Sequence, residues 1–326
     1  MGNRFLASAA LLALVIPPLS AQSAPPNRDR RAASTAKQWR TPWGDPDLQG
    51  AWSNATTTPL QRPAKYAGRE FLTEQERQAL DQETSIGTDR RGPVGSERDV
   101  NDAYNQFWWE RGWSDGRTSL IYDPPDGRIP PLTPEAQKRQ AELTRLNRSN
   151  EGFTGAASYI GPEELSLYSR CVIRAPLPRV PSGYDNNYQI VQAPEYVAIL
   201  QEQMHETRVI PLDRRPHLDS GVRQWLGDSR GHWEGNTLVV ETTNFGDQTT
   251  FEGSSRNLHL VERWTRVAAD RIDYRFTVED PTTWTRPWSA AISWNKAGML
   301  YEYACHEDNY AMYGILAGAR AQEKKK

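Results

Sequence analysis

The sequence predicts a mainly β protein, in which an antiparallel meander closes into a barrel with a few capping helices. Two observations support this fold class. In the second half of the chain, β-branched and aromatic residues alternate with polar residues in short runs. Gly, Asn, Asp and Pro separate these runs at the short intervals that join strands into hairpins. A two-sheet sandwich is the alternative architecture for the same pattern.

The expected strands follow one another as hairpins. Gly235 lies in a tight connection and can adopt a positive φ there. A meander of about eight strands closes most economically into a barrel, because closure leaves no exposed edge. The expected strands are 188–191, 196–201, 208–212, 231–233, 237–244, 259–267 and 271–279, with a last hairpin of 288–294 and 299–305.

Helix start signals are few. Thr73 and Glu76 form a capping box, in which the hydroxyl accepts from an amide of the first turn and the carboxylate reaches back. Thr133 precedes a proline, the pattern of an N-cap followed by proline at the first helical position. Pro162 opens a short helix that ends near residue 171, and a C-terminal helix begins near Tyr310. The three helices in the first half of the chain are expected to cover one side or the mouth of the barrel.

The N-terminal region has the features of a secretory signal peptide over residues 1–21. Arg4 supplies the positive start, residues 5–16 form an apolar run, and cleavage is expected after Ala21. No later stretch is apolar for long enough to span a bilayer, so no membrane insertion is expected after signal removal. We therefore expect a periplasmic or secreted protein.

The rest of the chain is expected to form one domain. Residues 22–40 have the composition of a disordered leader. Residues 41–321 are expected to form a single β-barrel-like domain with helical insertions, followed by a charged tail at 322–326. The sequence leaves the oligomeric state open.

Charge and cysteine content narrow the possible partners. The chain has 39 basic and 41 acidic side chains, interspersed, which gives no electrostatic reason for nucleic-acid binding. The two cysteines, Cys171 and Cys305, are expected to form a disulfide, because an exported chain meets an oxidising compartment. The alternative role of Cys305 as a nucleophile beside His306 is disfavoured, since neighbours on a strand point to opposite faces.

Three segments together resemble a known family. They are 41–52 (TPWGDPDLQGAW), 184–190 (YDNNYQI) and 228–242 (DSRGHWEGNTLVVET). These segments are similar to those of a large family of exported, mostly uncharacterised bacterial proteins, and the resemblance extends from residue 41 to about 320. It implies a shared fold and no secure activity. Gly50-Ala51-Trp52 is also similar to the Gly-x-Trp that opens lipocalins and other calycin barrels, which implies a lipocalin-like barrel.

Polar residues at the ends of the expected strands are the candidates for chemistry. His205 is the predicted base, because an imidazole exchanges protons near neutral pH. Arg208 is the predicted anion clamp, with Tyr188 or His306 as the acid. Each residue also has a non-catalytic alternative. His205 could be a surface histidine, Arg208 could form an ion pair with Glu206 or Asp213, and His306 could be a structural residue beside the disulfide. The expected substrate-binding residues are Asn186, Asn187, Trp108, Trp109, Arg230, Glu241 and Asn244.

Metal and cofactor signals are absent from the sequence. The five histidines lack metal-binding spacing, which leaves open only a zinc site assembled from distant strands. No phosphate loop, serine elbow or dinucleotide fingerprint occurs. Twelve tryptophans suggest either a ligand with flat faces or an aromatic core. The members considered for ligand binding are Trp108, Trp109, Trp113, Trp284 and Trp288.

These observations predict an exported barrel that binds a small molecule. The leading hypothesis is a cofactor-free lyase, isomerase or hydrolase that acts by proton transfer on a small sugar-like or aromatic substrate. The alternative is a non-catalytic carrier or scavenger of an apolar or glycosidic ligand. A structural protein of the cell envelope is a third possibility, which would have no pocket.

Overall fold

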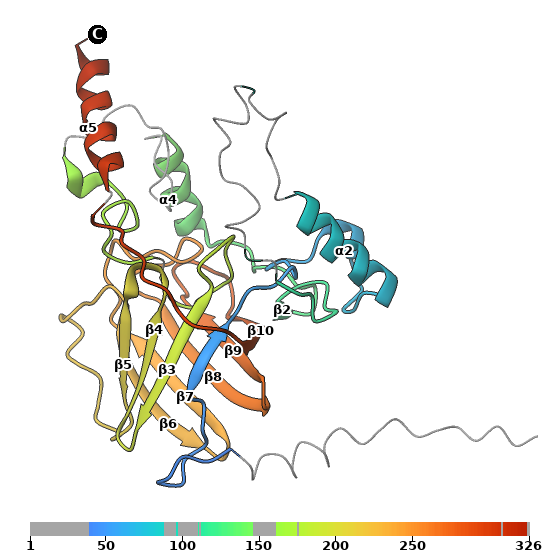
Figure 1. The fold of residues 1–326 in the computed structure, drawn as a ribbon. Coiled ribbons are helices and arrows are strands. Elements are labelled where there is room, and N and C mark those ends of the chain that lie inside the picture. Colours follow the sequence, from blue (N-terminus) through green and yellow to red (C-terminus); the bar gives the residue numbers. More distant parts are fainter. Residues whose placement is uncertain are drawn as a thin grey trace, which may run out of the picture.

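A ten-stranded antiparallel sheet curls into a nearly closed barrel (Figure 1). The computed structural model describes residues 39–87, 96, 110, 112–145, 161–174, 176–307 and 309–324. The predicted fold class is therefore confirmed. The strands are β1 (Gly50–Ser53), β2 (Ile121–Asp123), β3 (Asn187–Ala193), β4 (Tyr196–Gln201), β5 (Thr207–Pro211), β6 (Asp228–Glu234), β7 (Thr237–Thr243), β8 (His259–Ala268), β9 (Arg271–Glu279) and β10 (Trp288–Lys296).

Two meanders joined by β1 make up the sheet. The hydrogen-bonded order is β5-β4-β3-β1-β10-β9-β8-β7-β6, and β2 pairs with β10 beside β1. On β1, Trp52 is opposite Tyr188 on one side and Lys296 on the other. The expected strand 299–305 is wrong, because this segment contains no strand and is mostly exposed. The first strand takes the position beside β10 that the expected hairpin would need.

Side chains point alternately inward and outward along the strands, and the inward ones fill the barrel interior. On β9, Ile272, Tyr274, Phe276 and Val278 are at most 1% exposed, while the residues between them are more exposed. Tyr274 stacks on Trp264 with ring centroids 4.9 Å apart. Burying such side chains contributes roughly 1.5–3 kcal/mol each. The interior is therefore an aromatic core and not an open ligand cavity.

Trp52 closes one part of this core. Its ring is fully buried, and its Nε1 donates to the carbonyl of Leu48 at 2.9 Å. Arg266 and Lys296 place cationic groups 5.3 Å and 5.2 Å from the ring centroid. Cations held over an indole face stabilise it further. One hydrogen bond and two cationic side chains thus fix this buried tryptophan on β1, and the calycin resemblance stays a prediction.

The helices begin where their capping signals predict. In α2 (Glu74–Gly87), the Thr73 amide donates to Glu76 Oε2 at 2.8 Å and the Glu76 amide donates to Thr73 Oγ1 at 3.2 Å. Thr133 caps α4 (Pro134–Arg145) through a bond from the Ala136 amide. The short helix expected over 162–171 is only the single turn η2 (Pro162–Glu164), followed by turns. A further single turn, η1, spans Ala64–Tyr66.

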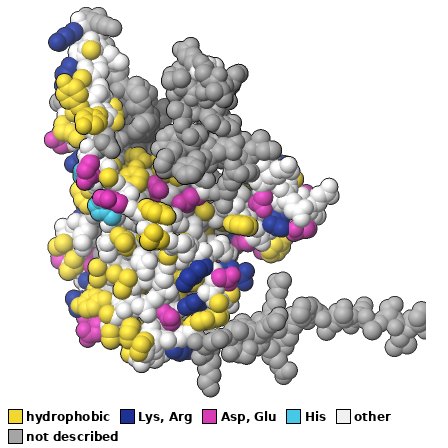
Figure 2. All heavy atoms as spheres, viewed as in Figure 1, with side chains coloured by type: hydrophobic (Ala, Val, Ile, Leu, Met, Phe, Trp, Pro, Cys, Tyr) yellow, Lys and Arg dark blue, Asp and Glu magenta, His cyan; other side chains and the backbone are white. Residues whose placement is uncertain are grey.

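The C-terminal helix α5 (Tyr310–Glu323) projects away from the barrel (Figure 1). Asn309 caps it by accepting from the Met312 amide at 3.4 Å. Hydrophobic side chains gather along it in Figure 2, and Tyr310 and Tyr313 are 78% and 80% exposed. In the part of the chain that the structure describes, no helix combines the length and the hydropathy needed to cross a membrane.

Candidate functional site

The barrel has a seam between β5 and β6. These strands are the two ends of the hydrogen-bonded order, and no ladder joins them in the described sheet. The side chain of Arg208 crosses the seam instead. Its Nε donates to Ser229 Oγ on β6 at 2.9 Å, and its Nη2 donates to Thr242 Oγ1 on β7 at 2.8 Å. One buried guanidinium on β5 therefore connects to β6 and β7 across a seam that no backbone ladder spans in the described sheet.

Glu262 on β8 is the ionic partner of Arg208. The guanidinium Nη2 pairs with Glu262 Oε2, and the carboxylate is only 1% exposed. The other carboxylate oxygen accepts from the Tyr274 hydroxyl at 2.8 Å. Burial and the Glu262 charge raise the pKa of Tyr274 well above its ordinary value. The phenol therefore remains a proton donor to the carboxylate at every physiological pH.

A second buried ion pair lies beside the first. Arg179 pairs with Glu206, and both side chains are 7% exposed. Burial lowers the pKa of Arg179 to about 9. Glu206 directly precedes β5, so the two ion pairs enter the barrel from neighbouring positions along the seam. Such a density of buried charge is unusual in an otherwise aromatic interior.

A small inner cavity of about 20 Å³ separates these charged groups from the aromatic core. Several polar atoms at this cavity have no hydrogen-bond partner, namely both side-chain polar atoms of Gln201 and the indole nitrogens of Trp264 and Trp294. The volume accommodates about one water molecule and excludes an organic substrate. The residues that line this cavity include Arg179, Tyr188, Gln201, Glu206, Arg208, Leu226, Glu262 and Tyr274.

A much larger groove opens outside the seam. Its volume is about 900 Å³, within the range of small-molecule sites. Glu206, Arg208 and Leu226 line both spaces, so they form the partition between the groove and the inner cavity. The other lining residues include Arg223, Trp225, Asp228, Ser229 and Arg230. A ligand in the groove would therefore contact the outer side of the buried ion pairs.

Three arginines and three acidic residues line the groove, and Arg223 is the arginine without a carboxylate partner among the described residues. Its Nη1 donates to the carbonyls of Arg256 at 2.6 Å and Phe245 at 3.4 Å, and its buried Nε has no hydrogen-bond partner. No carboxylate pairs with it among the described residues, whereas Arg230 is 2.6 Å from Asp228. Trp225 is 41% exposed at the same groove. The groove thus offers a cation and a flat aromatic face from residues that are two positions apart in the sequence.

Two predicted catalytic residues meet at the inner cavity. Arg208 and Tyr188 both line it, although they come from β5 and β3. Tyr188 stacks on Trp294 at 4.4 Å, and its hydroxyl accepts from Asn54 Nδ2 at 3.4 Å. Burial raises the pKa of this phenol. Arg230, predicted to bind substrate, lines the outer groove.

The two predicted histidines lie elsewhere. His205 and His306 are exposed, and neither lines the inner cavity or the groove. His205 ends the single turn η3 (Gln203–His205) with a φ of 40°, directly after Met204 at 62°. Left-handed backbone at two non-glycine residues costs of order 1–3 kcal/mol each. The turn directs the chain into β5, and the catalytic roles of the two histidines stay predictions.

Asn186 and Asn187 make local contacts at the start of β3. The Asn186 side chain exchanges hydrogen bonds with the backbone of Ser182 at 2.7 Å and 2.8 Å. Asn187 Nδ2 donates to Glu110 Oε1 at 3.0 Å and to Glu202 Oε2 at 2.7 Å. Neither asparagine lines the groove. Both side chains hold loops together in this structure.

Three carboxylates meet at this asparagine pair, which the sequence analysis does not anticipate. Oxygen atoms of Glu110, Asp185 and Glu202 lie within 4.8 Å of one another. Burial, together with Glu202 and Glu110, raises the pKa of Asp185 to about 6. The other two carboxylates already accept hydrogen bonds from Asn187. The cluster is therefore a site of charge repulsion near neutral pH.

The remaining predicted binding residues divide between surface and core. Asn244 is 8% exposed and donates to the carbonyls of Leu218 and Asp219, so it fixes the chain that leads into β6. Glu241 is exposed on the outer face of β7. Trp108 and Trp109 lie outside the described residues. Of the other tryptophans, Trp284 and Trp288 are core residues and Trp113 is 71% exposed.

Several site residues escape the sequence analysis. Arg179, Glu262, Arg223 and Trp225 were not expected in a site. Glu262 carried a usable signal, since it lies between Leu260 and Trp264 on the inward positions of β8. A charged residue on an apolar strand face requires a buried partner. The other three lie in loops, where no periodicity indicates the direction of a side chain.

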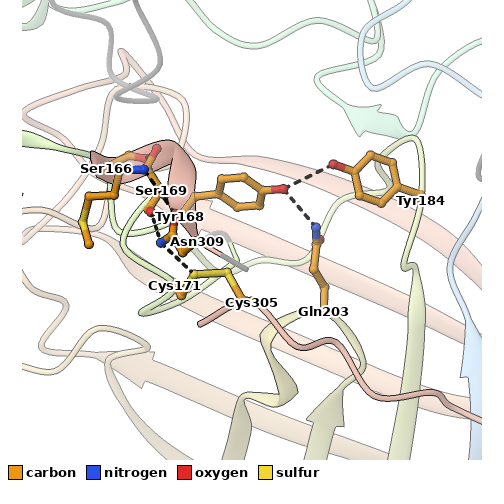
Figure 3. The surroundings of a disulfide bond; sticks show 9 residues. Ser166, Tyr168, Ser169, Cys171, Tyr184, Gln203, Cys305 and Asn309 are labelled. Carbon is orange, nitrogen blue, oxygen red and sulfur yellow. Dashed lines mark hydrogen bonds between the residues drawn. A yellow bond between two sulfur atoms is a disulfide. The ribbon is translucent and has the colours of Figure 1, made fainter. Parts of the chain in front are cut away.

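The predicted disulfide is present between Cys171 and Cys305, with Cα atoms 5.8 Å apart (Figure 3). It fastens the segment before α5 to the loop before β3. Hydrogen bonds surround it: Asn309 Nδ2 donates to the Ser169 carbonyl at 2.9 Å and to Cys171 Sγ at 3.2 Å. The crosslink is therefore part of a wider attachment of the C-terminal segment.

No protein-family model matches this sequence, and a search of curated proteins finds no match. The geometry of the seam is accordingly what supports a function, and the resemblance to a family of exported proteins stays a prediction.

Proposed function

We propose that this is an exported protein that binds a small organic anion in the groove between β5 and β6. The observation that carries the proposal is that Arg223, which has no carboxylate partner among the described residues, lines the same groove of about 900 Å³ as the exposed Trp225 indole. An arginine recognises carboxylate or phosphate through paired N–H donors, and an indole packs on a flat apolar face. The favoured ligand therefore carries both an anionic group and a planar or sugar-like part.

Export is supported by two features. The disulfide joins residues that are 134 positions apart, and such crosslinks persist in oxidising compartments. The first residues have the pattern of a signal peptide, and they lie outside the described part of the chain. Both features agree with a periplasmic or secreted location.

A second candidate function is cofactor-free proton-transfer catalysis on the same ligand. It is favoured by the ionisable groups that converge where the groove meets the inner cavity, since active sites concentrate perturbed ionisable groups. Arg208, which lines the groove, would hold the substrate anion. Tyr188 lines only the inner cavity and His205 lines neither space, so their acid and base roles rest on the sequence alone. A carrier would use the same groove without turnover.

Binding is tested first with a panel of small carboxylates, phosphates, neutral sugars and aromatic acids. Thermal shift identifies ligands, since a molecule that binds only the native state raises the melting temperature. Isothermal titration of each hit then compares wild type with Arg223→Ala and Trp225→Ala. Arg263→Ala and Trp43→Ala are matched controls, because these exposed residues lie outside the groove.

The expected result is at least a tenfold loss of affinity in both groove variants and none in the controls. Anions that bind equally well to all five proteins would refute the groove as the site. Catalysis is tested separately, by following a bound compound by NMR with wild type, His205→Ala and Tyr188→Phe. A compound that binds in the groove and stays unchanged identifies a carrier.

A further inference from the structure

Histidines and carboxylates alternate on the outer face of the barrel. His217 Nδ1 lies 2.9 Å from Asp228 Oδ2, and His217 Nε2 lies 3.8 Å from Glu241 Oε2. The other Glu241 oxygen lies 2.7 Å from His259 Nε2, and His259 Nδ1 lies 3.7 Å from Glu279 Oε2. The Glu241 carboxylate is thus between the Nε2 atoms of two imidazoles, each of which has another carboxylate at its Nδ1.

Strand alternation places these groups together. On β7, Val240 and Thr242 point into the barrel, so Glu241 between them points outward. His259 precedes the inward Leu260 on β8 and shares this outer face. The connection between β5 and β6 brings His217 over β6, held by the bond from the Leu218 amide to Asp228 Oδ2 at 2.9 Å. Strand pairing and one loop therefore assemble the group from separate parts of the chain.

We propose that His217 Nε2, His259 Nε2 and a Glu241 oxygen form a binding site for a transition-metal dication of the Zn²⁺ class. Two imidazole nitrogens and one carboxylate are a donor set that suits Zn²⁺, whereas Ca²⁺ and Mg²⁺ prefer oxygen alone. Water completes the coordination, because His259 and Glu241 have side chains that are 37% and 50% exposed. This site is independent of the proposed groove ligand.

The groups behind the ligands fit this assignment. A metal-bound histidine usually donates its second ring N–H to a carboxylate, which orients the ring. Asp228 has this position behind His217 and is 4% exposed, and Glu279 has it behind His259. In addition, the buried His217 Nε2 has no hydrogen-bond partner. The His217 nitrogen that a metal would take therefore has no hydrogen bond to give up.

Charge also favours a dication. Asp228, Glu241 and Glu279 are three acidic groups, and Arg230 is the guanidinium that pairs with one of them. With neutral imidazoles the group is negatively charged, and a divalent cation would balance it. Coordination requires the exposed His259 and Glu241 side chains to rotate toward His217, which their surface positions permit.

The test is isothermal titration of the mature, disulfide-bonded chain with Zn²⁺, and with Ca²⁺ in parallel. We expect one equivalent of Zn²⁺ to bind, and Glu241→Gln and His259→Ala to weaken binding at least tenfold. His232→Ala is the matched control, because His232 is a similarly exposed imidazole 3.2 Å from the single carboxylate of Glu234. This variant should bind Zn²⁺ as wild type does.

Two results would overturn the proposal. One is the absence of saturable Zn²⁺ binding to wild type. The other is Zn²⁺ binding that Glu241→Gln and His259→Ala leave unchanged, or that His232→Ala weakens equally. Both substituted side chains are well exposed, and circular dichroism confirms that each variant is folded.

Discussion

Arg208 on β5 and Glu262 on β8 form an ion pair inside the barrel, although 54 residues separate them in the sequence. The guanidinium reaches the carboxylate across the seam, where no backbone ladder joins the edge strands of the described sheet. It therefore supplies a connection that the main chain lacks. This pair also forms part of the partition between the groove and the inner cavity through Arg208.

Removing one member of this pair should be costly. Arg208→Met leaves the buried Glu262 carboxylate without its cation, which costs about 3–5 kcal/mol of unfolding free energy. Arg208→Met with Glu262→Gln should lose less, because no unpaired charge remains and the amide oxygen still accepts from Tyr274. Urea unfolding of both variants measures the difference.

The surface pair Arg263 and Glu234 on the same sheet is the control for that cycle. Its members are 44% and 49% exposed, so Arg263→Met should cost at most about 1 kcal/mol. A single Arg208 variant as stable as the double variant would show that the buried pair is not coupled.

Tryptophan substitutions should separate the groove from the core. Trp225 is 41% exposed, so Trp225→Ala should change stability by less than about 1 kcal/mol while it weakens ligand binding. Trp284 is 1% exposed and packs edge-on against Trp288, so Trp284→Ala should cost about 3–5 kcal/mol. Thermal unfolding measures both, and a Trp225 variant as unstable as the Trp284 variant would assign Trp225 to the core.

Asp185 should make stability depend on pH. Its pKa in the folded protein is raised from the ordinary value of 3.8 to about 6, first by burial and then by Glu202 and Glu110. A raised pKa means that the folded state holds this proton more tightly, so the contribution of Asp185 to stability is fully present below about pH 4 and is lost as the pH rises through 6.

Asp185→Asn removes this titration. The variant should therefore melt at a higher temperature than wild type at pH 8 and show little difference at pH 4, as measured by thermal unfolding across that range. Asp270→Asn, at an exposed turn, is the control for the loss of one aspartate charge. An Asp185 variant that is less stable at pH 8 would contradict the raised pKa.

The disulfide should protect the C-terminal segment more than the barrel. Cysteine-to-serine substitution at both positions removes a crosslink over 134 residues, for an expected loss of about 2–5 kcal/mol. Segment 299–307 contains no strand and should become sensitive to protease first. Limited proteolysis with mass spectrometry locates the cuts, and initial cleavage within the barrel strands would refute this order.

Local sequence signals predicted much of the fold because they act over a few residues. Strand alternation located β4 and β9 at their observed bounds, and the Thr73 capping box located the start of α2. Gly235 has the expected positive φ of 60° in its hairpin. The prediction of the fourth hairpin was wrong. Segment 299–305 has a strand-like pattern, but β1 pairs with β10 in the position that this segment would need.

The sequence alone determined the class of the fold, the helix starts and the cysteine pair, since these depend on short-range periodicity, capping chemistry and composition. Only the tertiary structure decided that β1 lies between β3 and β10, that β5 and β6 remain unjoined, and which side chains meet at that seam. These outcomes depend on contacts between residues far apart in the chain. Arg208 could be singled out from its position, but its partner Glu262 could be identified only once the barrel had brought β5 and β8 together.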